Sequence, residues 1–263
     1  MITLEQKYTK MNQTENIKTN IKNKTATITF YHPASNSFPS KQLEALTNAI
    51  NELNSNKEVI LIILASEGEK AFCAGASFDE LLQITDLENG TKFFSGFANV
   101  INAMRTSNKL IIGRVQGKTV GGGVGLAAAC DYCFATQAAS IKLSELAIGI
   151  GPFVIEPAVT RKIGFPAMSE MTLEAETWKT AQWAKEKQLF TQVFETISEM
   201  DESIEEFTSR LSNYNPEALY EMKKVLWKDT DHWNILLKER AAISGNLVLS
   251  DFTTNALNAF KNK

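Results

Sequence analysis

Three short segments rich in small residues contain the groups best suited to chemistry. They span residues 70–77 (KAFCAGAS), 116–126 (QGKTVGGGVGL) and 143–152 (LSELAIGIGP). In the first segment, the small residues Ala74, Gly75 and Ala76 allow a ligand to approach backbone N–H groups closely. In the second, a triple glycine precedes an apolar stretch, which predicts a helix over residues 124–130 whose N-terminus presents free N–H groups. Two such groups that converge on one carbonyl oxygen make an oxyanion hole, which stabilises negative charge on that oxygen.

The glycine-rich segment also has a simpler interpretation, because a Gly-rich turn between a strand and a helix often serves only tight packing. Its sequence, GKTVGGGVG, lacks the order G-x-x-x-x-G-K-[ST] of a phosphate-binding Walker loop. It is also a poor match to the G-x-G-x-x-G of dinucleotide-binding folds, which an acidic residue follows. Considered alone, the segment leaves packing and function both open.

The elements that must position these segments follow from hydrophobic periodicity. Apolar stretches predict strands over residues 25–30, 58–65, 110–116, 132–136 and 140–143. Helical spacing predicts helices over residues 39–54, 88–106, 166–174, 178–187, 201–211, 216–227, 233–244 and 253–261. The order of strand, helix and strand predicts an α/β fold. Residues 1–22 are polar, and we expect them to be loose at the start of the chain.

Strands become rare after Pro157, and this change divides the chain. We expect an α/β core over residues 1–190 and a helical C-terminal region over residues 191–263. The C-terminal helices are amphipathic and few, so we expect them to pack on the core or on another subunit.

Composition excludes several classes of function. Of the 263 residues, 44% are hydrophobic and 22% charged, which is ordinary for a globular protein. The net charge is -3 and no basic stripe is present, which argues against nucleic acid as a partner. The longest wholly apolar stretch, residues 59–65, is far shorter than the roughly 20 residues of a membrane span. With no signal-peptide core and no S-K-L tail, a cytoplasmic location is expected.

The three cysteines do not indicate a disulfide framework or a metal site. Cys130 and Cys133 have C-x-x-C spacing, but the histidines His32 and His232 supply no second ligand pair. We expect no metal, and we interpret these two cysteines and Cys73 as small core residues.

Taken in this order, the three segments resemble the crotonase (enoyl-CoA hydratase/isomerase) family. The similarity begins near residue 17, with the strand TITF and the turn HPASN. It continues through VILIILAS, AFCAGAS, GGGVGLAAACD and SELAIGIGP, and it reaches the later stretch NPEALYEMK. The pair of AFCAGA and the triple glycine, at this separation, is a specific feature of that family.

The resemblance implies a spiral of β-β-α turns with a helical C-terminal region used in assembly, as a homotrimer or hexamer. It implies an acyl-CoA thioester as substrate, within fatty acid metabolism, and no cofactor apart from the coenzyme A of the substrate. The backbone N–H groups of Ala76 and Gly122 would form the oxyanion hole for the thioester oxygen. The remaining members of the two turns would contact the substrate: Ala74, Gly75, Gly121 and Gly123.

Family hydratases carry two glutamates, and this sequence retains one of the two positions. The position of the first falls on Gly125, whereas the second falls on Glu145 in LSELAIG. Apolar neighbours such as Leu143 and Ile148 raise the pKa of a carboxyl group, which improves it as a base near neutral pH. The alternative is a structural glutamate. The position at which isomerases of dienoyl thioesters, and dehalogenases, place another carboxylate is Phe153.

Other departures concern coenzyme A binding and a second acid. Ser77 replaces the aspartate that commonly follows AGA, and the tail AFKNK is shorter than the basic, aromatic tail of many members. Lys70 and Lys118 are candidates for the coenzyme A phosphates or are solvated surface lysines. Glu156 is a possible second acid or a capping residue. The helix over residues 88–106 carries Phe93, Phe94, Phe97 and Met104, which either line an acyl pocket or pack in the core.

A shift of a double bond between the 3,4 and 2,3 positions of an enoyl thioester needs one base, whereas hydration normally needs a second group to orient water. The sequence therefore predicts an enoyl-CoA isomerase in which Glu145 is the catalytic base. Two alternatives stay open: an enoyl-CoA hydratase, including one for a branched or glutaconyl-type substrate, and a non-catalytic acyl-CoA-binding protein.

Overall fold

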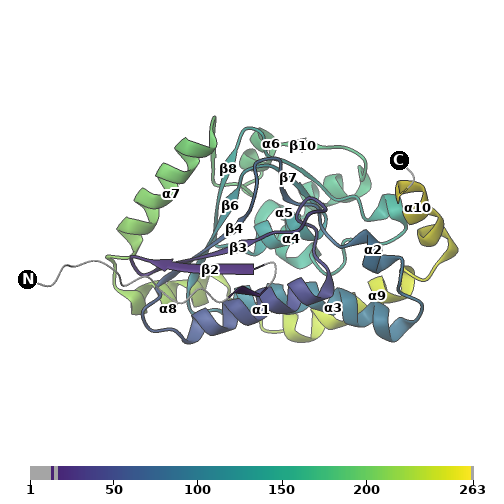
Figure 1. Cartoon of the computed structure of the whole chain (residues 1–263), viewed down its shortest axis with the longest axis horizontal. Helices are drawn as coiled ribbons and strands as arrows, with labels where there is room; N and C mark the ends of the chain where they lie inside the picture. The colour runs from purple at the N-terminus through teal and green to yellow at the C-terminus, as the bar shows by residue number, and fades with distance from the viewer. Residues whose placement is uncertain (1–12, 15–16, 262–263) are drawn as a thin grey trace, which may run out of the picture.

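The computed structural model describes residues 13–14 and 17–261, and its strands form two sheets (Figure 1). The larger sheet contains, in spatial order, β1 (Gln13–Thr14), β2 (Ile17–Lys22), β3 (Thr25–Phe30), β4 (Leu61–Ser66), β6 (Leu110–Val115), β8 (Tyr132–Thr136) and β11 (Gln192–Phe194). Strands β3, β4, β6, β8 and β11 pair in parallel, while β1 and β2 add an antiparallel edge. The buried β4 is apolar nearly throughout, as a strand covered on both faces requires.

The smaller sheet carries the strands that lead to the three small-residue segments. Its order is β10 (Lys179–Thr180), β9 (Ser140–Lys142), β7 (Lys118–Val120) and β5 (Ala71–Cys73). Strands β5, β7 and β9 are parallel to one another, and each follows a strand of the larger sheet in the chain. This repeat of two strands and a helical segment confirms the spiral expected from the sequence.

Helices surround the two sheets, and most lie where the sequence predicted them. Their bounds are α1 (Ser40–Ser55), α2 (Phe78–Leu81), α3 (Leu87–Thr106), α4 (Gly122–Ala129), the 3-10 helix η1 (Leu146–Ile148), α5 (Glu156–Leu173), α6 (Ala181–Glu186), α7 (Ile197–Leu211), α8 (Pro216–Leu226), α9 (Trp233–Leu247) and α10 (Asp251–Lys261). Among the described residues, none of these helices combines the length and hydrophobicity of a bilayer span.

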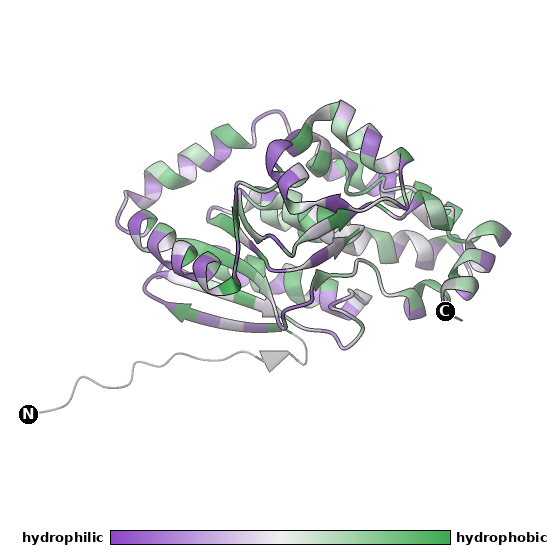
Figure 2. Cartoon of the chain, turned by 90° about the horizontal axis from the view of Figure 1, so that it is seen from above, coloured by the Kyte–Doolittle hydropathy of each residue, from purple (hydrophilic) through white to green (hydrophobic). Residues whose placement is uncertain are grey.

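The C-terminal helices pack on the core of the same chain. In Figure 1, α9 runs beside α3 and α10 lies at the end of the molecule nearest the C-terminus. At the α3–α9 crossing, a Cβ atom on Gly90 would lie 2.6 Å from the carbonyl oxygen of Gly245, so only glycine permits this approach. Helix α10 contacts η1 through Phe252, which packs against Gly149. In Figure 2, α10 carries both hydrophilic and hydrophobic residues, as expected of a helix with one packed face.

Three expectations about secondary structure are wrong. Residues 17–22 form β2, because a tight turn with positive φ at Asn23 and Lys24 pairs β2 with β3; residues 1–12, also expected to be loose, lie outside the described residues. Residues 179–180 form β10 instead of helix, because they pair with the edge of β9. Helix α5 begins ten residues before the expected start at 166, with a break at Gly164, whose φ is 75°.

A buried ion pair ties the end of α4 to α8. Asp131 Oδ2 accepts hydrogen bonds from Lys223 Nζ at 3.0 Å and from the Ile111 N–H at 2.7 Å, and its Oδ1 accepts one from Trp227 Nε1 at 2.6 Å. The side chain of Asp131 is only 6% exposed and that of Lys223 only 2%. Burial lowers the pKa of Lys223, and the charge of Asp131 opposes that change. The lysine therefore depends on this aspartate to remain charged inside the protein.

We expect the substitution Asp131→Asn to lower the free energy of unfolding by about 3–5 kcal/mol, because it leaves the buried Lys223 ammonium without its counter-charge. Urea denaturation followed by circular dichroism measures this change. The control is Glu67→Gln, which breaks the exposed Lys18–Glu67 pair of 2.6 Å and should change stability by less than about 1 kcal/mol. Equal effects of the two substitutions would contradict the assignment.

Candidate active site

The small parallel sheet brings the three small-residue segments together. Because β5, β7 and β9 run in the same direction, the turns that follow them lie at one edge of the sheet. These turns carry Ala76, Gly122 and Glu145, respectively. A further bridge pairs Phe38 with Ala76 and fixes the first turn from its other side.

The turn after β5 lies directly against the start of α4. Gly75 has a φ of 85°, and a Cβ atom there would lie 2.9 Å from the Val120 carbonyl oxygen and 3.5 Å from the Gly122 nitrogen. Glycine is thus required both for the backbone conformation and for the contact. In the part of the chain that the structure describes, the N–H groups of Ala76 and Gly122 donate no hydrogen bond. The structure therefore places the two proposed oxyanion-hole donors in adjoining turns, and both are available to a ligand.

Glu145 approaches the same point from the turn after β9. The Gly121 N–H donates a hydrogen bond of 2.9 Å to the Lys142 carbonyl, which holds the start of α4 against β9. Gly121 has a φ of 53°, and a Cβ atom on it would lie 2.8 Å from Glu145 Oε1. The carboxylate therefore lies against the backbone of the residue that precedes the Gly122 donor.

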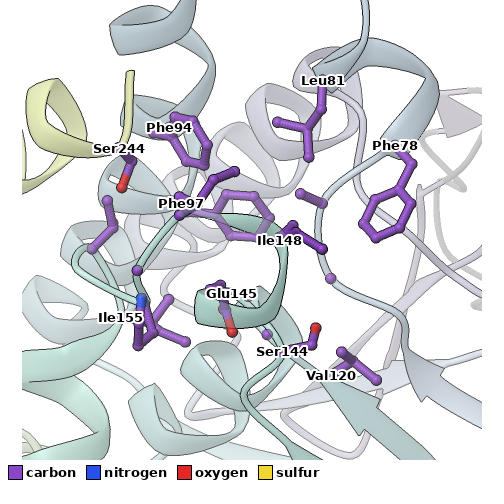
Figure 3. Close-up of a pocket in the computed structure, with 18 of the residues that line it drawn as sticks. Phe78, Leu81, Phe94, Phe97, Val120, Ser144, Glu145, Ile148, Ile155 and Ser244 are labelled. Atoms are coloured by element: carbon purple, nitrogen blue, oxygen red, sulfur yellow. The ribbon is translucent and has the colours of Figure 1, made fainter. Parts of the chain in front are cut away.

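These groups border a pocket that is almost entirely apolar (Figure 3). Glu145 is the one side chain with an ionisable group among the residues that line it. The other polar side chains are those of Ser144 and Ser244. The rest of the lining comprises Ala74, Gly75, Ala76, Phe78, Leu81, Phe94, Phe97, Val120, Gly121, Gly122, Ile148, Ile150, Gly151, Pro152, Val154 and Ile155.

Burial sets the protonation of the carboxyl group. Glu145 is half-buried as a residue, but its Oε2 is enclosed and has no hydrogen-bond partner among the described residues. Loss of hydration raises the pKa of Glu145 from the ordinary 4.5 to about 7, opposed in part by its own backbone N–H. A carboxylate with this pKa can both accept and return a proton near neutral pH.

The structure places most of the expected site residues in the pocket lining. Ala74, Gly75 and Gly121 line it beside the two proposed donors, whereas Gly123 is buried against Cys73 outside it. On α3, Phe94 and Phe97 line the pocket. Their neighbours Phe93 and Met104 are buried in the core.

Several residues that matter in the pocket carried no signal in the sequence. Ser244 comes from α9, distant from the three motifs, while Ile155 lies three residues beyond the third segment, and Phe78 and Leu81 come from the short helix α2. Ser77, which replaces the expected aspartate, caps α2 by accepting the Glu80 N–H. A close inspection of FDEL for a short amphipathic helix would have pointed to α2, but only the folded chain reveals Ile155 and Ser244.

The position of the missing first glutamate is occupied by packing. Gly125 lies in α4, where a Cβ atom would lie 2.6 Å from Ile155 Cβ and nearer still to Ile155 Cγ2. Phe153 lies beside a different groove, which Glu156 also borders. Glu156 accepts a hydrogen bond of 2.6 Å from Thr160 and lies 3.9 Å from Arg240. Neither residue belongs to the lining of the Glu145 pocket.

The cysteines have the structural place expected of them. Cys73, Cys130 and Cys133 are free and fully buried. Across the described ranges, no group of three or more His, Cys, Asp or Glu side chains has the arrangement of a metal site.

Comparison with known proteins agrees with this geometry. The sequence model of the family described as "Enoyl-CoA hydratase/isomerase" matches residues 20–258. A short-chain-enoyl-CoA hydratase of Clostridium acetobutylicum is 29% identical over 205 residues, which cover 77% of each chain. The peroxisomal Delta(3,5)-Delta(2,4)-dienoyl-CoA isomerase of Arabidopsis thaliana is 28% identical over 198 residues, which cover 70% of this chain and 69% of that protein.

Solved structures show the same fold. The crystal structure of enoyl-CoA hydratase from Bacillus halodurans matches with a TM-score of 0.86 over 93% of this chain and 100% of that chain, at 21% identity. The spiral of paired strands and the helical C-terminal region are those of the crotonase fold. The chain therefore belongs to the enoyl-CoA hydratase/isomerase, or crotonase, family.

Proposed function

We propose that this protein is an enoyl-CoA isomerase, which moves a double bond between the 3,4 and 2,3 positions of an acyl-CoA thioester. The observation that supports the proposal most directly is one buried carboxylate, with a pKa of about 7, beside two free backbone N–H groups. This set supplies one base and one oxyanion hole, and the reaction needs no more.

The proposed reaction transfers one proton within the substrate. Glu145 takes the proton from the α-carbon of a 3-enoyl thioester, and the electron pair of that C–H bond passes into a dienolate whose oxygen accepts hydrogen bonds from Ala76 and Gly122 N–H. The protonated Glu145 then returns the proton to the γ-carbon, and the 2,3 double bond forms as the thioester carbonyl is restored. Each such donor typically contributes about 2.7–4 kcal/mol to lowering the barrier.

Hydration of a 2-enoyl thioester is the alternative reaction, and it is supported by similarity to a relative that is named as a hydratase. Water must then be held opposite the double bond, and a second carboxylate would normally orient it. At position 125 the space for any side chain is filled by Ile155. The apolar lining offers Ser144 and Ser244 as its further polar side chains, and neither is a base at neutral pH.

The lining also favours an uncharged acyl group. A glutaconyl-type substrate would bring a second carboxylate into a pocket that contains Glu145 and whose lining contains no cation. Burying a second negative charge beside the first is unfavourable unless a cation compensates it. We therefore expect a neutral, apolar acyl chain that packs against Phe94 and Phe97.

A protein that only bound acyl-CoA would gain nothing from an enclosed carboxyl group without a partner. Such a group lowers stability when it is ionised, and groups of this kind concentrate at catalytic sites. This cost favours catalysis over simple binding.

Assembly and location stay predictions. Several large apolar side chains are exposed in the single chain, including Phe165, Leu173 and Phe252 at 73%, 75% and 64%. Contact with another subunit would cover them. A homotrimer or hexamer in the cytoplasm remains our expectation, as does the absence of any cofactor other than the coenzyme A of the substrate.

With a 3-enoyl-CoA in heavy water, we expect NMR to show the 2-enoyl product, with deuterium at the α-carbon of recovered substrate. Accumulation of 3-hydroxyacyl-CoA would instead establish hydration.

We expect Glu145→Gln to lower turnover by about 10²–10⁴-fold, because the base is lost. The matched control is Glu156→Gln, which lies outside the pocket and should retain activity.

For the wild type, kcat/KM should rise with pH up to about 7 and then level, because Glu145 must be ionised to accept a proton. A profile that is flat through that range would contradict the role of Glu145.

Glu145→Gln should also stabilise the protein at alkaline pH. Because the folded-state pKa of Glu145, about 7, exceeds the ordinary 4.5, the folded protein holds this proton more tightly than the unfolded chain. Protonated Glu145 therefore contributes to the free energy of unfolding, by at most roughly 3 kcal/mol. This contribution is complete below about pH 4.5 and is lost as the pH rises through 7. The neutral glutamine does not ionise, so the gain of the variant over the wild type in chemical denaturation should be larger at about pH 8.5 than at about pH 5. A gain that does not depend on pH would rule out this cause.

The packing of Ile155 on Gly125 can be tested by a double-mutant cycle. Gly125→Ala should lower the free energy of unfolding by about 1–3 kcal/mol, because the new methyl group collides with Ile155. In an Ile155→Ala background the collision is removed, and alanine should then be tolerated or favoured within α4. Additive effects of the two substitutions in thermal denaturation would show that Ile155 does not fill this space.

A further inference from the structure

Ser244 brings an unpaired hydroxyl group into the lining of the apolar pocket. The residue belongs to α9 and is only 1% exposed, yet it lines the same pocket as Glu145. Among the described residues, no hydrogen-bond partner is found for its Oγ. An enclosed hydroxyl group without a partner is unfavourable, so a ligand that supplies a partner gains affinity.

The hydroxyl group of Ser244 is not satisfied in the way that is usual inside a helix. Serine and threonine side chains in helices commonly donate to the carbonyl four residues earlier. Thr47 and Thr208 do so in this protein, at 2.9 Å and 2.8 Å. Within the described part of the chain, Ser244 makes no such bond to the carbonyl of Arg240. Its hydroxyl group therefore remains available to the pocket.

A close contact between two helices fixes Ser244 in this place. The next residue, Gly245, meets α3 at Gly90, where a Cβ atom would lie 2.6 Å from the Gly245 carbonyl oxygen. Phe94 follows Gly90 by one helical turn, so the face of α3 that meets α9 also carries an aromatic ring to the pocket. The two helices thus present the hydroxyl group and the ring together.

Ser244 lies at the enclosed end of the pocket. In Figure 3, Ser244 and Phe94 lie on the side opposite Val120 and Ser144, with Glu145 between them. Val120 and Ser144 are half-buried, whereas Ser244 is buried. Coenzyme A is too highly charged to enter an apolar pocket, so it must remain on the more open side. The part of the substrate that reaches Ser244 is then the acyl chain.

The surroundings of Ser244 favour an uncharged partner. Arg240 precedes Ser244 by one turn of α9, but it borders the neighbouring groove and lies 3.9 Å from Glu156. None of the described residues that line the Glu145 pocket is a cation. A charged group at the enclosed end would lose its water with only a serine hydroxyl as partner. A neutral oxygen needs no more than that single hydrogen bond.

We propose that Ser244 selects acyl chains that carry a neutral oxygen, in a hydroxyl or carbonyl group, at the end away from the thioester. This role rests on the proposed function for its substrate class. It adds one polar atom to the otherwise apolar acyl chain expected there, and it makes Ser244 the residue that distinguishes such a chain from a plain alkyl chain. The serine can donate to either kind of oxygen and can also accept from a hydroxyl group.

Calorimetric titration with saturated acyl-CoAs tests this selection without any turnover. The probes are butanoyl-, hexanoyl- and octanoyl-CoA, each with and without a terminal hydroxyl group. We expect one chain length at which the wild type binds the hydroxylated probe more tightly than the plain probe. At that length, Ser244→Ala should lower the ratio of the two affinities by about 10-fold, because the hydroxyl group of the probe loses its partner.

Two further variants separate hydrogen bonding from packing. Ser244→Cys keeps nearly the size of serine but offers only a weak donor, so its affinity ratio should resemble that of Ser244→Ala. Recovery of the wild-type ratio by cysteine would assign the effect to packing and contradict the proposal. Ser144→Ala is the matched control, because it removes the serine on the other side of the pocket and should leave the ratio unchanged.

Equal ratios in the wild type and Ser244→Ala at every chain length would overturn the proposal, as would a wild type that prefers plain chains throughout. Water would then be the partner of the hydroxyl group. Saturated chains have no double bond to move, so failure of the isomerase assay leaves the result of the titration intact. A wild type that binds none of the probes would overturn the acyl-CoA substrate class and the selection together.

Discussion

The parallel pairing of three very short strands is the constraint on which the rest of the site depends. Strands β5, β7 and β9 contain three residues each, and their common direction puts three turns at one edge. Positive φ at Gly75 and Gly121 then brings those turns into contact. Two N–H groups and one carboxylate meet there although more than 60 residues separate Ala76 from Glu145 in the chain. Such short strands have little stability of their own, so the larger sheet and the helices around it must hold them in register.

The apolar surroundings of Glu145 serve the proposed reaction and oppose folding through the same physical effect. Removing water from the carboxyl group raises its pKa to about 7, which makes the group a better base near neutral pH. The same loss of hydration disfavours the ionised form in the folded protein. Asp131 shows the contrasting solution for a buried carboxylate, because Lys223, Trp227 and a backbone N–H all donate to it. Both carboxylate oxygens of Asp131 thus accept hydrogen bonds from the protein, whereas Oε2 of Glu145 has no partner among the described residues.

The sequence predicted what depends on local patterns. The apolar stretch that became β4, the helical spacing of α3 and the small residues around Gly75 and Gly122 were all visible before folding. Strand β10 was not, because two residues become a strand only through pairing with β9. Ile155 and Ser244 could not be assigned to the pocket, because their place there depends on how α5 and α9 cross the core. Local composition identifies chemical groups, whereas long-range packing decides which side chains shape the space around them.

The contact between Gly125 and Ile155 changes how the missing glutamate is understood. Considered in the sequence alone, glycine at that position is a lost catalytic group and weakens the case for an enzyme. In the structure the position is filled by a neighbouring apolar side chain, so the pocket wall is continuous and water has no carboxylate there to hold it. An apolar wall in this pocket suits the proposed reaction, in which the proton must return to the substrate without competing attack by water. Glycine at position 125 therefore agrees with the proposed proton transfer, and it leaves Glu145 and the N–H groups of Ala76 and Gly122 at the pocket.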